Sequence, residues 1–142
     1  MADVIYNSYA VDLGKADVDF LVDTIKVALV TSSYTPDQDT HDFYDDITNE
    51  VANGNGYTTG GATLANKSVT KDNVNNRSVL DADDTAWTTS SFTARGAVIY
   101  KDTGVASTSP LICYKDFGSD KTVSSGTFTI SWNAAGILTI NS

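Results

Sequence analysis

Hydrophobic and polar residues alternate along much of the chain, which is the pattern of β-strands that bury one face. In Thr24–Thr31, Ile25, Val27 and Leu29 alternate with smaller or polar residues, and this period of two predicts a half-buried strand. Seven later runs are rich in β-branched and aromatic residues and are bounded by turn-forming residues. They are residues 61–70, 75–82, 85–92, 92–101, 110–117, 126–132 and 136–141.

Two of these runs indicate what the strand faces carry. In residues 126–132, Phe, Ile and Trp alternate with Thr and Ser, so one face should lie on a core and the other should face water or a partner. In residues 92–101, Arg95 has the same parity as Thr93. We therefore expect Arg95 to face solvent or a neighbouring molecule.

One short helix is predicted in the segment that follows the first strand. Thr40 offers a hydroxyl that can cap a helix N-terminus. Phe43, Ile47 and Val51 then recur every four residues, which places them on one side of a helix. The Asn and Gly residues of 53–56 are typical of a helix end, so the helix should stop before them.

The pattern as a whole predicts a mainly β protein. About eight strands at intervals of roughly 8 to 12 residues, with one short helix, indicate an antiparallel β-sandwich or barrel. A chain of 142 residues with 41% hydrophobic residues fits one compact domain. We expect a single β-rich domain over residues 23–142, preceded by an N-terminal arm over residues 1–22.

The charge of the chain narrows the classes of partner. There are 18 acidic and 9 basic side chains, which give a formal net charge of -9. Nucleic-acid binding is therefore not expected, because affinity for nucleic acid comes largely from cations that neutralise phosphates. The N-terminus lacks the basic and apolar parts of a signal peptide, and no apolar run approaches about 20 residues. We expect a chain that is made and folded in a cytoplasm and that has no membrane partner.

The single cysteine and the single histidine offer little catalytic chemistry. Cys113 has no partner for an intrachain disulfide, and its apolar neighbours favour a small buried side chain with a raised thiol pKa. His41 lies among acids, where a Ser-His-Asp arrangement is formally possible if a distant serine folds against it. No nucleophile motif accompanies it. A solvated histidine in the first turn of the predicted helix is the preferred interpretation.

The acidic and glycine-rich runs do not match known metal or phosphate motifs. Asp37 and Asp39 begin an acidic run, but Asp42 stands where a calcium loop needs glycine, and Thr48 occupies its last ligand position. Residues 53–61 contain no Gly-Lys-Ser/Thr and precede a strand. Glu50, the only glutamate, is explained by the predicted helix. We expect no catalytic residue, no metal and no cofactor, and hence no enzyme.

Consecutive blocks of the chain resemble a family of small proteins of tailed bacteriophages. The blocks are DTIKVALVTSSYTPDQDTHDFYDDITNEV, GYTTGGATLA, FTARGAVIYKDTG, SPLICYKDFGSDKTVSSGTFTISW and GILTI, and together they extend from Asp23 to Ile140. The resemblance implies a virion structural protein, with capsid decoration or cement as the favoured role. It implies the major capsid protein or other virion subunits as partners, several copies together on the particle, and a position on the capsid surface.

Five aromatic residues are candidate partner contacts, because Tyr and Trp are enriched at protein interfaces. The competing interpretation is that these rings fill the edge of the domain's own core. Two other functions also suit a β-rich chain: a tail or neck component such as a tube, adaptor or fibre-associated domain, and a carbohydrate-binding module whose Tyr57 and Trp87 stack on sugars. The five candidates are Tyr6, Tyr9, Tyr34, Tyr57 and Trp87.

Overall fold

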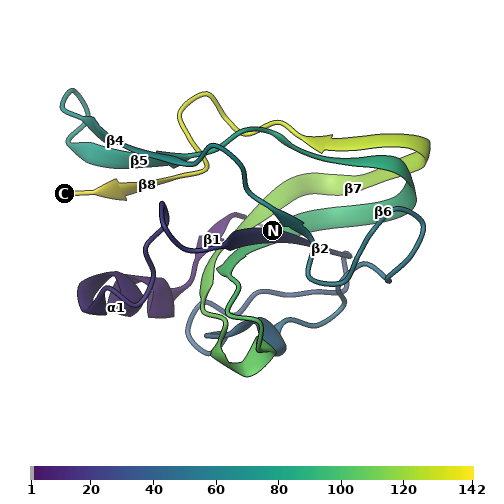
Figure 1. Cartoon of the computed structure of the whole chain (residues 1–142), viewed down its shortest axis with the longest axis horizontal. Helices are drawn as coiled ribbons and strands as arrows, with labels where there is room; N and C mark the ends of the chain where they lie inside the picture. The colour runs from purple at the N-terminus through teal and green to yellow at the C-terminus, as the bar shows by residue number, and fades with distance from the viewer. Residues whose placement is uncertain (1) are drawn as a thin grey trace.

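A computed structural model describes residues 2–142 and confirms the mainly β prediction. Within these residues it contains one α-helix, α1 (Asn7–Lys15), and two short 3-10 turns, Tyr44–Asp46 and Ala106–Thr108 (Figure 1). The eight strands are β1 (Val4–Ile5), β2 (Ile25–Val30), β3 (Ala62–Thr63), β4 (Ser68–Asp72), β5 (Arg77–Asp81), β6 (Thr85–Lys101), β7 (Leu111–Ile130) and β8 (Leu138–Asn141).

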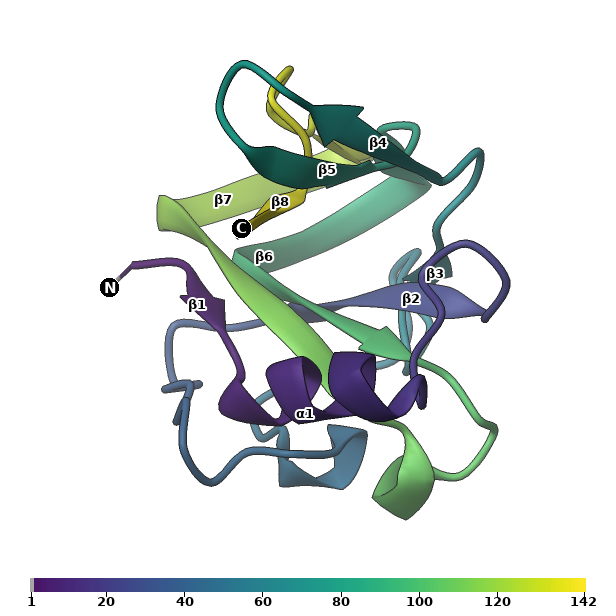
Figure 2. The same ribbon diagram turned by 90° about the vertical axis from the view of Figure 1, so that its left-hand side faces the viewer.

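The strands form two antiparallel sheets that pack as a sandwich. The large sheet has the order β1-β7-β6-β2-β3, and the small sheet has the order β4-β5-β8. Figures 1 and 2 show the small sheet and α1 on the same side of the large sheet, with the small sheet near one end and α1 near the other. The sandwich, and not the barrel, is therefore the correct member of the predicted pair.

The two central strands are longer than the sequence indicated. The predicted strands 85–92 and 92–101 are parts of one strand, β6, which has 17 residues, and β7 has 20 residues. Thr89 and Ser125 have positive φ angles of 50° and 46°, so the two strands bend sharply where Ser and Gly residues suggested breaks. Pairing resumes after each irregularity, because β-bulges bend a strand without ending its ladder.

The predicted helix that begins at Thr40 is wrong, and the helix lies in the N-terminal segment. Only the turn Tyr44–Asp46 is helical there, and the Asp46 carboxylate accepts hydrogen bonds from the amides of Asp42 and Phe43. The Val51 amide instead donates to the carbonyl of Leu29 in β2. Helix α1 has no side-chain N-cap and no acidic residue in its first turn, so it lacks the signals that mark the start of a helix.

The segment set apart as an N-terminal arm packs against the rest of the domain. Met1 lies outside the described residues. Val4 and Ile5 of β1 pair with Tyr114 and Cys113 of β7, which extends the large sheet. Tyr6, Tyr9, Val18 and Phe20 are all buried. In this structure residues 2–22 therefore contribute to the same core as residues 23–142.

Hydrophobic clusters cover both faces of the large sheet. Ala97 and Ile99 of β6 lie in the cluster under the small sheet and α1, whereas Val98 and Tyr100 lie in a second cluster under the loop of residues 31–61. The centre of β6 is thus buried on both faces. The second cluster consists of Tyr6, Ala28, Val30, Tyr34, Val98, Tyr100, Leu111 and Tyr114.

The expectation that Arg95 faces solvent or a neighbour is confirmed only in part, because the side chain is half-buried and pairs with Asp116 of the same chain. The pairing register between β6 and β7 shifts between Ala94 and Gly96, so residues 117–120 of β7 bulge opposite Arg95. The Arg95 guanidinium Nε lies 2.9 Å from the carboxylate Oδ1 of Asp116, and the side chains of Arg95 and Asp116 are 26% and 4% exposed. A bulge changes the direction of the side chains that follow it, which strand parity alone does not reveal.

Candidate interaction surface

The five aromatic residues predicted as partner contacts all lie inside the domain. Tyr6, Tyr9, Tyr34 and Tyr57 are at most 2% exposed, and Trp87 is 6% exposed. This burial agrees with the competing interpretation, in which the rings fill the domain's own core. Their contact with a partner stays a prediction, and in this conformation they present almost no surface to one.

Two of these five residues, Tyr6 and Tyr34, form a polar chain that ends at His41. The hydroxyls of Tyr6 and Tyr34 lie 2.7 Å apart, and the Tyr34 hydroxyl lies 2.9 Å from Nδ1 of His41. The backbone amide of Asp37 also donates to this Nδ1, at 3.1 Å. The histidine is half-buried and stacks on the Tyr34 ring. His41 therefore fastens the loop of residues 37–41 to the core and is not the solvated helix residue that the sequence suggested.

Glu50 joins the long loop to the large sheet. The hydroxyls of Tyr57 and Tyr44 donate to its carboxylate, the first at 2.5 Å, and the Gly60 amide donates to it at 2.7 Å. The Tyr57 hydroxyl also accepts a hydrogen bond from the Leu29 amide of β2. Burial, followed by this hydrogen-bonded carboxylate, raises the pKa of Tyr44, and burial with the Glu50 charge raises the pKa of Tyr57. The only glutamate thus has a structural role that the sequence did not reveal.

The remaining candidate groups offer neither a metal cage nor a reactive thiol. Cys113 is buried as predicted, and burial raises its thiol pKa to about 12. Between residues 2 and 142, no three His, Cys, Asp or Glu side chains are grouped so that they could hold a metal ion. In that same part of the chain, no helix is long and apolar enough to cross a membrane.

A groove follows β7 from the end where the strand curls back on itself to the gap between β1 and β8. This curled end consists of residues 117–131. Three adjoining hollows of about 410, 240 and 410 Å³ compose it. The first and second hollows share Phe117 and Ile130, and the second and third share Lys115 and Ile137. Neighbouring hollows therefore share lining residues and follow one another along β7.

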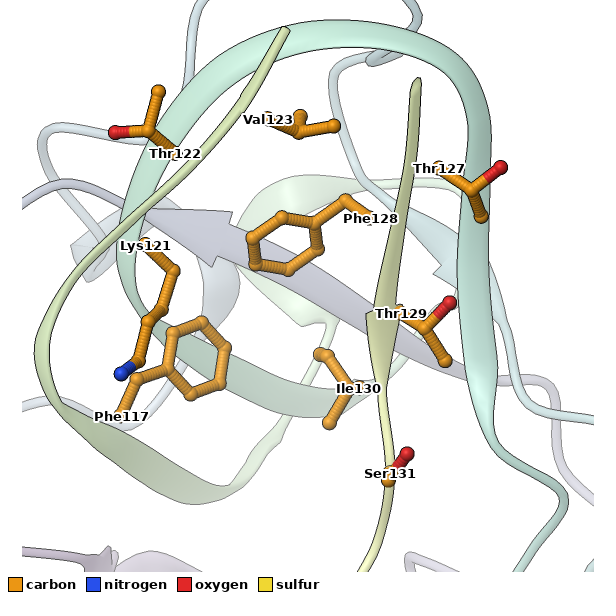
Figure 3. Close-up of a pocket in the computed structure, with 9 residues that line it drawn as sticks. All are labelled: Phe117, Lys121, Thr122, Val123, Thr127, Phe128, Thr129, Ile130 and Ser131. Atoms are coloured by element: carbon orange, nitrogen blue, oxygen red, sulfur yellow. The ribbon is translucent and has the colours of Figure 1, made fainter.

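The curled end of the groove has an apolar floor. Figure 3 shows Phe117, Phe128 and Ile130 pointing into the space between the two arms of β7, with Lys121 beside Phe117. The Phe117 and Phe128 rings lie 6.0 Å apart between centroids, and Phe92 supports Phe128 from β6 at 5.1 Å. Aromatic contacts at these separations are favourable. The floor is therefore held in place from behind by the core.

Polar groups surround this floor. The hydroxyl residues at the rim are Thr122, Thr127, Thr129 and Ser131. The exposed ammonium of Lys121 is the cation at the curled end, while in the middle of the groove Lys115 pairs with Asp3 at 3.4 Å. The hydrogen bond from Arg95 lowers the pKa of Asp116, which keeps the carboxylate charged in the second hollow. An apolar floor within a polar rim is the composition of protein interfaces.

Sequence reasoning did not find this groove. Phe117 and Phe128 appeared only as alternating residues of two separate strands, and the bulge that brings them together lies in residues 117–120. The one available signal was Gly118, whose φ of 81° suits the bulge.

Comparison with known proteins identifies no relative. No family model matches the chain, and no curated protein or solved structure is similar to it.

Proposed function

We propose that the chain is a virion structural protein of a tailed bacteriophage, which binds the assembled capsid shell and decorates or stabilises it. The resemblance of residues Asp23 to Ile140 to small phage proteins supports this proposal. The tail and neck role is a rival with the same supporting sequence. The location of the chain on the particle separates the two roles.

The observation that carries the proposal is the groove on β7. Its floor of Phe117, Phe128 and Ile130 lies on a framework of paired strands and packed aromatic rings, so a partner would meet a preformed surface. Burial of apolar area contributes about 25 cal/mol per Å², and a specific interface buries on the order of 1,000 Å² in total. A capsid repeats the same docking position many times, and any contact that spans two capsid subunits opposes their separation.

The net charge suits a subunit that accumulates before it docks. At -9, free copies repel one another, which opposes precipitation while the chain accumulates. Lys121 provides a local positive charge at the curled end of the groove, where it is the charged residue among those that line the first hollow. We expect the capsid surface that meets this groove to present an aliphatic or aromatic side chain beside an acidic one.

Attachment of purified chain to particles that lack it tests the proposal. The Phe117→Ser variant should lose most co-sedimentation with these particles, because it removes the apolar floor of the groove. Val74→Ser is the control, since Val74 is 89% exposed at the tip of the β4–β5 hairpin and does not line the groove. Equal binding by both variants, or binding restricted to the tail, would contradict the proposal.

A carbohydrate-binding role is the second candidate, and the groove also favours it in one respect. Aromatic residues bordered by hydroxyls resemble a sugar-binding surface, although Tyr57 and Trp87 are buried and unavailable for stacking. Under this alternative Phe117 would take their place. Binding on a glycan array that disappears in Phe117→Ala, with the fold intact, would support it, and no binding to any glycan would remove it.

A further inference from the structure

The outer edge of β4 is the most exposed strand edge of the small sheet. The sheet order β4-β5-β8 leaves β4 and β8 at its two margins. In β4 the three central residues, Val69, Thr70 and Lys71, are exposed, whereas β8 is mostly covered. Figures 1 and 2 show the small sheet at the margin of the molecule, at the end away from α1. An edge strand presents unpaired N–H and C=O groups to which another strand can add.

The strand that best complements this edge is β4 of a second copy of the chain. Two copies related by a two-fold axis perpendicular to the sheet would pair β4 antiparallel with itself. Such an axis keeps each face of the sheet on its own side, so each residue must lie opposite a residue of the same parity. In each such register one residue lies opposite its own copy at the axis. Most of β4 is paired only when this central residue is 69, 70 or 71.

Charge selects one of these three registers. A centre at Val69 places Lys67 opposite Lys71 of the second copy, and a centre at Lys71 places two copies of Lys71 opposite each other. Like charges directly opposite on paired strands are destabilising. A centre at Thr70 avoids both conflicts and pairs all five residues of the strand.

The register centred on Thr70 is also self-complementary. Thr70 lies opposite Thr70 of the second copy, and opposed threonines can exchange a hydrogen bond. Ser68 lies opposite Asp72, whose carboxylate already pairs with Arg77 of its own chain, so this position brings no like charges together. Lys71 lies opposite Val69, which is 42% exposed in the single chain, and the aliphatic stem of the lysine would cover it.

We propose that two copies of the chain associate through antiparallel pairing of β4 about a two-fold axis at Thr70, which joins the small sheets into one six-stranded sheet. The inference stands on the exposure and register of β4 and is independent of the virion proposal. Five paired residues bury less area than a standard interface. The dimer is accordingly weak, with a dissociation constant between about 10 μM and about 1 mM, and it strengthens where the chain is concentrated.

The test uses complementary charges at the axis. Thr70→Glu places two carboxylates opposite each other, and Thr70→Lys places two ammonium groups there, so each variant alone should stay monomeric. An equimolar mixture should form the mixed dimer, because the two charges then attract. Thr139→Glu in β8 is the control, because Thr139 and Thr70 both lie opposite Val79 and so share one cross-strand row. This variant should dimerise like the unmodified chain.

Sedimentation velocity of the full chain and its variants, from about 10 μM to about 1 mM, measures the outcome. Salt at about 0.15 M limits repulsion between the acidic copies. Circular dichroism establishes that each variant is folded. A dimer that is lost in both Thr70 variants and restored in their mixture supports the inference. A monomer at every concentration, dimerisation of Thr70→Glu alone, or a mixture that stays monomeric overturns it.

Discussion

Raising the pH should unfold the protein cooperatively, because the folded state disfavours ionisation of every tyrosine. All seven tyrosines have a raised pKa, and burial is the largest cause in each case. For Tyr9 and Tyr34 the pKa rises from 10.0 to about 12. Both side chains are 1% exposed, so solvent does not screen this effect.

The sign and size of the effect follow from proton linkage. The unfolded chain loses its tyrosine protons near pH 10, while the folded chain retains them to a higher pH. The contribution of these groups to stability is therefore complete below about pH 10 and is lost as the pH rises towards about 12. At about pH 11, the linkage at Tyr9 and at Tyr34 lowers the free energy of unfolding by about 1.4 kcal/mol each, or about 3 kcal/mol together. The other tyrosines act in the same direction, against a typical total stability of about 5 to 15 kcal/mol.

A pH titration followed by two probes measures this behaviour. Tyrosinate absorbance reports ionisation, and far-ultraviolet circular dichroism reports the fold. We expect little tyrosinate below the transition, followed by a steep rise of absorbance that coincides with loss of the β signal. Gradual ionisation of most tyrosines with a midpoint near about pH 10, while the dichroism spectrum is unchanged, would refute the reasoning.

Three further predictions concern individual contacts. Glu50→Ala should lower the free energy of unfolding in urea by about 3 kcal/mol, because it leaves buried donors without an acceptor; a loss below about 1 kcal/mol would contradict the structural role of Glu50. Tyr34→Phe should lower the free energy of unfolding by about 1 to 3 kcal/mol, because it removes two buried hydrogen bonds. Tyr9→Phe should leave it almost unchanged, because within residues 2–142 the buried Tyr9 hydroxyl has no hydrogen-bond partner. Equal shifts of the melting temperature in the two variants would be inconsistent with this difference. Arg95→Gln should be less stable than the unmodified chain at neutral pH. The difference in stability should shrink as the pH falls below about 4, because the ion pair that lowers the pKa of Asp116 contributes only while the carboxylate is charged. A stability difference that is constant with pH would argue against this prediction.

The strands were predictable because their signal is local. Ile25, Val27 and Leu29 alternate over β2, and all three are buried as predicted. The strand is not half-buried, however, because Ala28 and Val30 on its other face are buried too. The helix was misplaced because Phe43 and Val51 share a helical spacing by coincidence. Phe43 is 39% exposed, while the Val51 backbone pairs with β2. Tertiary pairing therefore overrode the local pattern.

The features that make the groove and the buried tyrosine network depend on contacts between distant residues. The Tyr6 hydroxyl meets that of Tyr34, 28 positions along the chain, and Glu50 meets Gly60 across a loop. No spacing rule relates such residues. Similarly, the bulge opposite Arg95 exists only in the pairing of β6 with β7. Sequence patterns gave the class of fold, and long-range packing decided which aromatic residues are buried.

The proposal that the chain adheres to a phage capsid is tested most directly by counting and locating it on purified particles. Quantitative mass spectrometry gives its ratio to the major capsid protein, and a density map of the same particles gives its position. The account predicts copies on the order of hundreds, spread over the shell, with the β7 groove facing capsid subunits. Particles that lack the chain, or that carry only a few copies in the tail, would contradict it.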